Sequence, residues 1–165
     1  MYNVDTTKGL NQRVEAGTYE VFINNMSEEA LPSGKEFISV DILIRNDVQQ
    51  QFKDRQFKER LWMKKDGTGY VLALLGSIKK ALGNEGEFNY PSFAEMREDF
   101  LRKPFQVKID WVTTKNESTG KEYTNLNFLE VNPSALPVLN HQYTIKQQAP
   151  LDSKPIDISD SDLPF

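Results

Sequence analysis

A β-branched apolar residue at every second position from 38 to 44 is the clearest pattern in the chain. One set of alternate positions holds Ile38, Val40, Ile42 and Ile44, and the other holds Phe37, Ser39, Asp41, Leu43 and Arg45. Because successive side chains of a strand point to opposite faces, this segment is predicted to be a strand with its isoleucine face in the core. A similar alternation around Tyr19 and Val21 predicts an earlier strand that begins near Thr18, and turn residues at positions 32–34 separate the two.

A third strand is predicted from about Gln56 to Met63. One face carries Phe57, Leu61 and Met63 together with Glu59, and the other carries Lys58, Arg60 and Trp62. Burying unpaired charges costs free energy, whereas burying apolar groups is favourable, so we expect the face with the two bases to be exposed.

The hydrophobic period then changes from two residues to 3.6. After the turn at 66–69, apolar residues between Val71 and Leu82 fall on one side, which predicts a helix that stops at Gly83. Ser92 and Glu95 have the spacing of a capping box for a short second helix that ends before Pro104. Alternation returns at 105–111 and 123–130, which predicts a final hairpin.

The predicted order is three strands, one or two helices, and two strands. This order is typical of the OB-fold, a five-stranded barrel that binds oligonucleotides across strands 2 and 3. We therefore predict a mainly β protein whose OB-fold spans residues 1–131.

From Asn132 onward, prolines and small polar residues interrupt every longer pattern. We interpret residues 132–156 as a flexible linker and residues 157–165 as an acidic tip, which together form a disordered tail. Within the linker, Leu136 to Ile145 keeps some apolar character and could pack on the body or on a second subunit. A homo-oligomer is therefore possible, and a dimer is our guess.

Composition limits the protein class. At 165 residues and 38% hydrophobic, the chain can bury one core, and it contains no cysteine for disulfides or cysteine metal sites. No apolar run approaches the roughly 20 residues that span a bilayer, and the first residues lack the apolar stretch of a secretory signal. These features predict a cytoplasmic protein.

The formal net charge of -4 is unevenly spread along the chain. Residues 152–165 hold four acids and one base, so they carry -3 and leave the rest of the chain at -1. Between Lys53 and Lys65, six bases face two acids, and the aromatic residues Phe57 and Trp62 lie among them. Such a basic, aromatic stripe is typical of single-stranded nucleic-acid binding, in which cations neutralise phosphates and rings stack on unpaired bases.

The exposed face of the third strand, with Lys58, Arg60 and Trp62, is the predicted centre of a DNA-binding site. The flanking candidates from the second strand and the neighbouring loops are Phe37, Arg45, Lys53, Arg55, Lys64 and Lys65, and further candidates are Lys108 and Tyr123. Trp62 could instead belong to the rim of the core, where we expect Phe57 and Trp111. The step from Arg45 to Asp47 could equally be a turn that satisfies local backbone groups.

The last residues combine acids with an apolar plug: Asp160, Asp162, Leu163, Pro164 and Phe165. Carboxylates can steer such a peptide to a basic pocket whose apolar floor Phe165 fills. The segment resembles the acidic tip of bacterial and phage single-stranded-DNA-binding proteins (SSB), which recruits replication, recombination and repair enzymes. A merely solubilising acidic tail is the alternative. Because the tip is tethered to a basic surface, it could also compete weakly with nucleic acid there.

Four segments of the body carry a second resemblance. They are Gly17-Thr18-Tyr19-Glu20-Val21, Ser33-Gly34-Lys35-Glu36-Phe37-Ile38, Ile44-Arg45-Asn46-Asp47-Val48 and Leu61-Trp62. These segments resemble a phage and prophage family from Gram-positive bacteria, long described as a domain of unknown function and now regarded as single-stranded-DNA-binding proteins. The resemblance spans roughly Gly17 to Leu129. It implies an OB-fold and a role in DNA replication, recombination or repair of a bacteriophage inside its host cell.

Enzymatic activity is not expected. His141, the only histidine, lies in the proline-bounded region, where we interpret it as an ordinary surface side chain. The carboxylates of the body match no metal loop, and the glycine-rich turn at 66–69 lacks the Gly-Lys-Ser/Thr ending of a phosphate-binding loop. We therefore predict no cofactor and no metal. The competing hypothesis is an adaptor or inhibitor that binds no DNA and uses its SSB-like tail to capture host replication or repair proteins.

Overall fold

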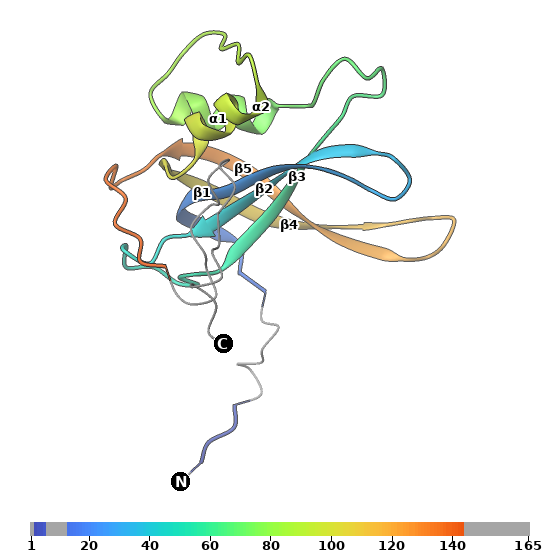
Figure 1. Ribbon diagram of the computed structural model, residues 1–165. Helices are drawn as coiled ribbons and strands as arrows, with labels where there is room; N and C mark the ends of the chain where they lie inside the picture. The colour runs from blue at the N-terminus through green and yellow to red at the C-terminus, as the bar shows by residue number, and fades with distance from the viewer. Residues whose placement is uncertain (1, 6–12, 144–165) are drawn as a thin grey trace, which may run out of the picture.

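The computed structural model describes residues 2–5 and 13–143, and its main element is a five-stranded antiparallel sheet (Figure 1). The strands are β1 (Gly17–Ala30), β2 (Glu36–Ile44), β3 (Gln56–Trp62), β4 (Pro104–Lys115) and β5 (Glu122–Pro133). Two helices, α1 (Ala73–Ala81) and α2 (Phe93–Phe100), come between β3 and β4. The predicted order of strands and helices is confirmed.

The strand order across the sheet is β3-β2-β1-β4-β5, and each neighbouring pair is antiparallel. β3 and β5 are therefore the two edges, and within the described residues they do not pair to close a barrel. The structure thus shows a mainly β protein with one open sheet and two helices.

The long strand β1 joins the two halves of the sheet. It pairs with β4 over residues 17–22 and with β2 over residues 21–30. The register shifts between Ile23 and Asn25, and a bulge of this kind bends a strand and increases its twist. In the view of Figure 1, the β1–β2 and β4–β5 hairpins extend toward the same side of the molecule.

One face of the sheet forms the core together with both helices, which lie on the same side of the sheet in Figure 1. The predicted isoleucine face of β2 is confirmed, because Ile38, Val40, Ile42 and Ile44 are at most 1% exposed. The helices add to the same cluster Leu75, Ile78, Ala81, Met96 and Phe100. Neither helix of the described part is long or apolar enough to cross a membrane.

Both helix ends that the sequence predicted are present. The Ser92 side chain accepts a hydrogen bond from the backbone N–H of Glu95 at 3.2 Å, which caps the start of α2. Gly83 follows α1 with φ of +91°, a conformation that glycine adopts without steric cost. Local side-chain and backbone chemistry therefore fixes where α1 ends and where α2 begins.

The opposite face of the sheet, here called the outer face, is partly covered by residues 134–143, here called the strap. Arg45 is fully buried at this place and donates hydrogen bonds to the main-chain oxygens of Leu136 at 2.7 Å and Val138 at 2.8 Å. It also donates to the Ser134 hydroxyl at 3.0 Å. The sequence left open whether the stretch from Leu136 packs on the body or on a second subunit. Its described part packs on the body. The folded body therefore continues past residue 131 to Tyr143.

His141 anchors the far end of the strap. Its ring centroid lies 4.9 Å from that of Phe22, and its Nδ1 accepts the backbone N–H of Asn46 at 3.1 Å. The residue is only 8% exposed. The prediction of an ordinary surface side chain is therefore wrong, because the strap carries His141 back onto the sheet.

Candidate nucleic-acid interface

The outer faces of β2 and β3 bring the predicted aromatic and basic residues together. Phe37 lies opposite Trp62 and Asp41 opposite Lys58, while Arg60 lies between the two pairs on the same face. Directly opposed side chains of antiparallel strands have Cβ atoms about 4.5–5.5 Å apart, so these residues form one continuous surface.

The predicted division of the third strand into two faces is confirmed. Phe57 and Leu61 are buried in the core cluster, whereas Lys58 and Arg60 are exposed. Glu59 shares the core side of the strand, and burial raises the pKa of its carboxyl group. The positive charges of β3 therefore lie on the outer face alone.

Phe37 and Trp62 form the aromatic centre of this surface. Their ring centroids are 5.0 Å apart and their planes meet at 51°. The guanidinium carbon of Arg60 lies 4.9 Å from the Phe37 centroid and 5.8 Å from that of Trp62. Phe37 is only 5% exposed, while Trp62 is half-buried and lies outside the core cluster, so Trp62 presents the larger ring surface.

Lys35 completes the arrangement, although no pattern in the sequence predicts its position. Its Nζ atom lies 4.3 Å from the centroid of Trp62, within the range of a cation–π contact. The residue belongs to the turn before β2, where no strand period indicates the direction of a side chain. Only its position two residues before Phe37 could have suggested a shared face. We call Lys35, Phe37, Lys58, Arg60 and Trp62 the platform.

Four predicted bases extend the platform along the direction of β3. Lys64 and Lys65 follow the end of the strand and are exposed. Lys53 and Arg55 precede its start and are half-buried, and Lys53 Nζ donates to the Gln49 side chain at 3.1 Å. The basic stripe thus runs the length of one edge of the sheet.

Lys108 and Tyr123 do not join the platform by strand pairing. Lys108 pairs with Thr18 of β1, whereas Phe37 pairs with Glu29 of the same strand. At 3.3 Å per residue, about 35 Å of strand separates Thr18 from Glu29. Tyr123 lies in the separate β4–β5 hairpin, where it is 49% exposed. Both residues belong to other parts of the outer surface.

Arg45 lies in the interior and not on an accessible surface. Besides its bonds to the strap, its Nε and Nη2 atoms donate to the two carboxylate oxygens of Asp47 at 2.8 and 2.7 Å. Asn46 holds the strap as well, since its side chain donates to the Gln142 main-chain oxygen at 2.6 Å and accepts the Gln142 N–H at 2.9 Å. Residues 45–47 therefore hold residues 134–142 on the sheet through hydrogen bonds. Arg45 does not belong to the interface.

One acidic group lies inside the basic surface. Asp41 is adjacent to Lys58, and its Oδ1 atom is buried without a hydrogen-bond partner among the described residues. Burial raises the pKa of this carboxyl group, and the positive charge of Lys58 opposes that effect without cancelling it. An ionised Asp41 weakens the attraction of this surface for phosphate.

No cluster of three or more His, Asp or Glu side chains suited to a metal ion is found in the described ranges. The predicted docking residues, Asp160, Asp162 and Leu163 to Phe165, lie outside those ranges. The docking tip therefore stays a prediction.

Fold and site together define a small, mainly β protein that carries a cation-covered aromatic pair on the outer face of its sheet. The chain belongs to the family described as a protein of unknown function (DUF669), whose match covers residues 2–137. This range includes all five strands and the first residues of the strap. No curated protein matches the chain. The family description names no activity.

Proposed function

We propose that the protein binds single-stranded DNA without sequence preference. The observation that carries this proposal is the platform: an aromatic pair 5.0 Å apart, with Lys35 over Trp62 and Arg60 over Phe37, on the outer face of β2 and β3.

The mechanism combines two terms that ignore base sequence. Every unpaired base can stack on an aromatic ring, and each stack contributes about 1–3 kcal/mol. Lysine and arginine neutralise phosphates and release their counterions, which makes affinity fall with salt. In this proposal a base stacks on Trp62, the more exposed ring, and the long side chains of Lys35 and Arg60 turn from the rings to the adjacent phosphates.

The finer fold assignment belongs to the same proposal. We infer that the sheet acts as an OB-fold, in which the outer faces of β2 and β3 bind the strand. Three features support this inference: the helices between β3 and β4, the pairing of β1 with both β2 and β4, and the basic outer face of β3.

The cellular role follows from strand binding combined with the acidic tip. The protein would cover and protect single strands during DNA replication, recombination or repair in the cytoplasm of a bacterial host. The tip, Asp160 to Phe165, would recruit partner enzymes to the covered strand. Its acids and apolar plug support this role, because they suit a basic pocket with an apolar floor.

The test is tryptophan fluorescence during titration with oligothymidine, with duplex DNA in parallel and across a salt series. The Trp111→Phe variant should keep the quenching by the single strand, because Trp62 remains as the reporter, and the Trp62→Phe variant should lose it. Trp111 is a suitable control, since its indole N–H donates to the Val14 main-chain oxygen at 2.7 Å, away from the platform. If the oligonucleotide gives neither quenching nor a mobility shift at low salt, strand binding is refuted.

A further inference from the structure

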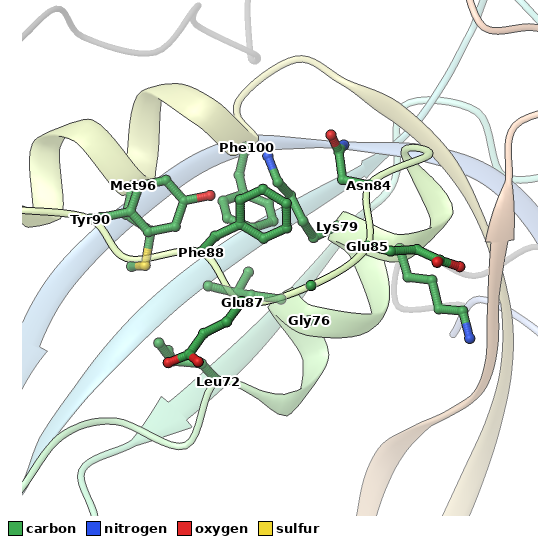
Figure 2. Close-up of a pocket in the computed structure, with 13 residues that line it drawn as sticks. Leu72, Gly76, Lys79, Asn84, Glu85, Glu87, Phe88, Tyr90, Met96 and Phe100 are labelled. Atoms are coloured by element: carbon green, nitrogen blue, oxygen red, sulfur yellow. The ribbon is translucent and has the colours of Figure 1, made fainter.

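A second candidate site lies on the helix side of the sheet, opposite the platform. A partly open cavity of about 520 Å³ lies between α1, α2 and the connection over residues 84–90 (Figure 2). Its apolar and aromatic lining consists of Leu72, Leu75, Phe88, Tyr90, Met96 and Phe100. Nothing in the strand-binding proposal uses this cavity.

An ammonium group lies among the rings of the cavity. Lys79 Nζ is 4.6 Å from the Phe88 centroid and 5.9 Å from that of Phe100, as the view in Figure 2 illustrates. It also donates to Asp99 Oδ2 at 2.6 Å, while Lys103 pairs with Asp99 Oδ1 at 3.0 Å. Two cations therefore share one carboxylate, and the cluster keeps a positive charge.

The carboxylate between these cations stays ionised. Hydrogen bonds from Lys79 and Tyr90 hold the pKa of Asp99 well below its usual range. Lys80 adds a further cation to the lining. The α1 side of the cavity thus suits a ligand that joins a bulky apolar group to a negative charge, whereas Glu85 and Glu87 line the side formed by the connection between the helices.

Residues 160–165 of this chain have that chemistry, with the carboxylates of Asp160 and Asp162 followed by Leu163, Pro164 and Phe165. We propose that the cavity between α1 and α2 is a docking site for the chain's own acidic tip. The Phe165 ring enters the apolar lining, and the Asp162 carboxylate faces the ammonium groups of α1.

The connecting chain is long enough for this contact. Tyr143, the last residue that the structure describes, lies on the outer face. At roughly 3.3 Å per residue, residues 144–165 can span up to about 70 Å. A body of this size has a diameter of about 36 Å, so half its circumference is about 57 Å. A tethered ligand has a local concentration in the millimolar range, so even weak intrinsic affinity fills the site.

The charges at the cavity decide between docking within one chain and capture of a separate acidic peptide. Glu85 and Glu87 also line the cavity and repel acidic residues, so the net electrostatic attraction is small. Apolar burial must then supply most of the affinity. A ligand held mainly by apolar contacts binds weakly when it is a separate peptide in solution. It binds more completely when it is tethered to the same chain, because tethering raises its local concentration, and this favours the chain's own tip.

Docking would regulate the tip itself. The apolar plug that a partner enzyme would grip is covered while it lies in the cavity, and it becomes available when the tip is released. The inference does not rest on DNA binding, and its test contains no nucleic acid, so each proposal can fail without the other.

The test uses the full chain, with a nitroxide spin label on a Ser159→Cys substitution. The natural chain contains no cysteine, so the label occupies a single site. Paramagnetic broadening of amide signals in the isotope-labelled protein then reports which residues the tip approaches. We expect broadening of Gly76, Lys80, Gly86 and Glu87, and none on the platform.

Three variants make the result specific. Phe165→Ala removes the plug and should abolish the broadening without touching the body. Gly76→Leu should abolish it by filling the cavity, and a Cβ at Gly76 meets no atom within 4 Å, so the added side chain has room. Ser77→Leu adds the same side chain at an exposed neighbouring position that does not line the cavity, and should leave the broadening intact.

Three outcomes would overturn the proposal. Broadening on the platform in place of the cavity would assign the tip to the basic surface, and no broadening anywhere would show an undocked tip. Broadening that persists when labelled and spin-labelled chains are separate molecules in one sample would show docking between copies. If Gly76→Leu fails to fold, Phe165→Ala still decides the question in the natural body.

Discussion

The guanidinium group of Arg45 has no exposed surface, and all of its hydrogen-bond donors are occupied. Asp47 takes two bonds, and Ser134, Leu136 and Val138 take one each. A buried charge in such a network is costly to disturb, because its partners cannot return to water without unfolding. Arg45 is therefore a residue on which the stability of the outer face depends.

Substituting Arg45→Ala should destabilise the protein by about 3–5 kcal/mol, the usual loss when one member of a buried ion pair is removed. The Asp47 carboxylate would lose two of its hydrogen bonds, and the carbonyls of Leu136 and Val138 would each lose one. Urea unfolding monitored by circular dichroism measures the change. The control is Arg60→Ala on the exposed face, expected within about 0.5 kcal/mol of the natural chain. Equal effects of the two substitutions would contradict the interior role of Arg45.

Asp41 gives a prediction about pH. The pKa of its carboxyl group is raised in the folded state above the usual value of 3.8. At a pH between 3.8 and the raised pKa, the folded state holds a proton that the unfolded state has released. Stability therefore falls as pH rises through that interval. Asp41→Asn removes this loss, so the variant should gain stability relative to the natural chain as pH rises above about 4. Parallel unfolding curves across this range would show that Asp41 titrates normally.

At the scale of elements, the turn between β1 and β2 delivers a cation to the ring face of Trp62. The slope of log K against the logarithm of the salt concentration measures how many phosphates the protein contacts. Lys35→Gln should reduce the magnitude of this slope by about 0.7, the value for one phosphate contact on a single strand. Lys108→Gln should leave the slope unchanged, because its pairing with Thr18 keeps it out of the platform. Titrations of oligothymidine at several salt concentrations distinguish the two. A larger effect at Lys108 would move the interface to β4.

Much of the architecture was predictable because its signals are local. The isoleucine alternation of β2, the Ser92 cap and the Gly83 stop each depend on a few neighbouring residues, and each is present. The exposed face of β3 was predictable for the same reason, since strand periodicity alone separates Lys58 and Arg60 from Phe57.

The missed features depend on contacts between distant parts of the sequence. The strap is held by bonds between residues 45–47 and residues 134–142, and no local period encodes such pairing. When only neighbouring residues are considered, the sequence predicts an exposed base at Arg45 and a surface side chain at His141. The position of Lys35 over Trp62 likewise requires the register of two strands and the path of a turn.

At the scale of the whole molecule, the strap sets the boundary of the folded body. A chain ended after residue 143 should keep nearly all of its stability. A chain ended after residue 133 should lose roughly 2–5 kcal/mol, because Arg45 loses three hydrogen bonds and Phe22 loses the ring of His141. Thermal unfolding of the two truncated chains measures the difference. Equal melting temperatures would mean that the strap only rests on the sheet.

The open sheet gives the basic stripe a second consequence. β3 is an edge strand of the described sheet, and edge strands expose backbone groups that can pair with another chain. Lysine and arginine on such a strand repel the same residues of a neighbouring copy, so we expect Lys58 and Arg60 to oppose edge-to-edge pairing as well as to form the platform. Phosphates that neutralise these cations remove the repulsion, and copies crowded along one DNA strand would then meet edge to edge.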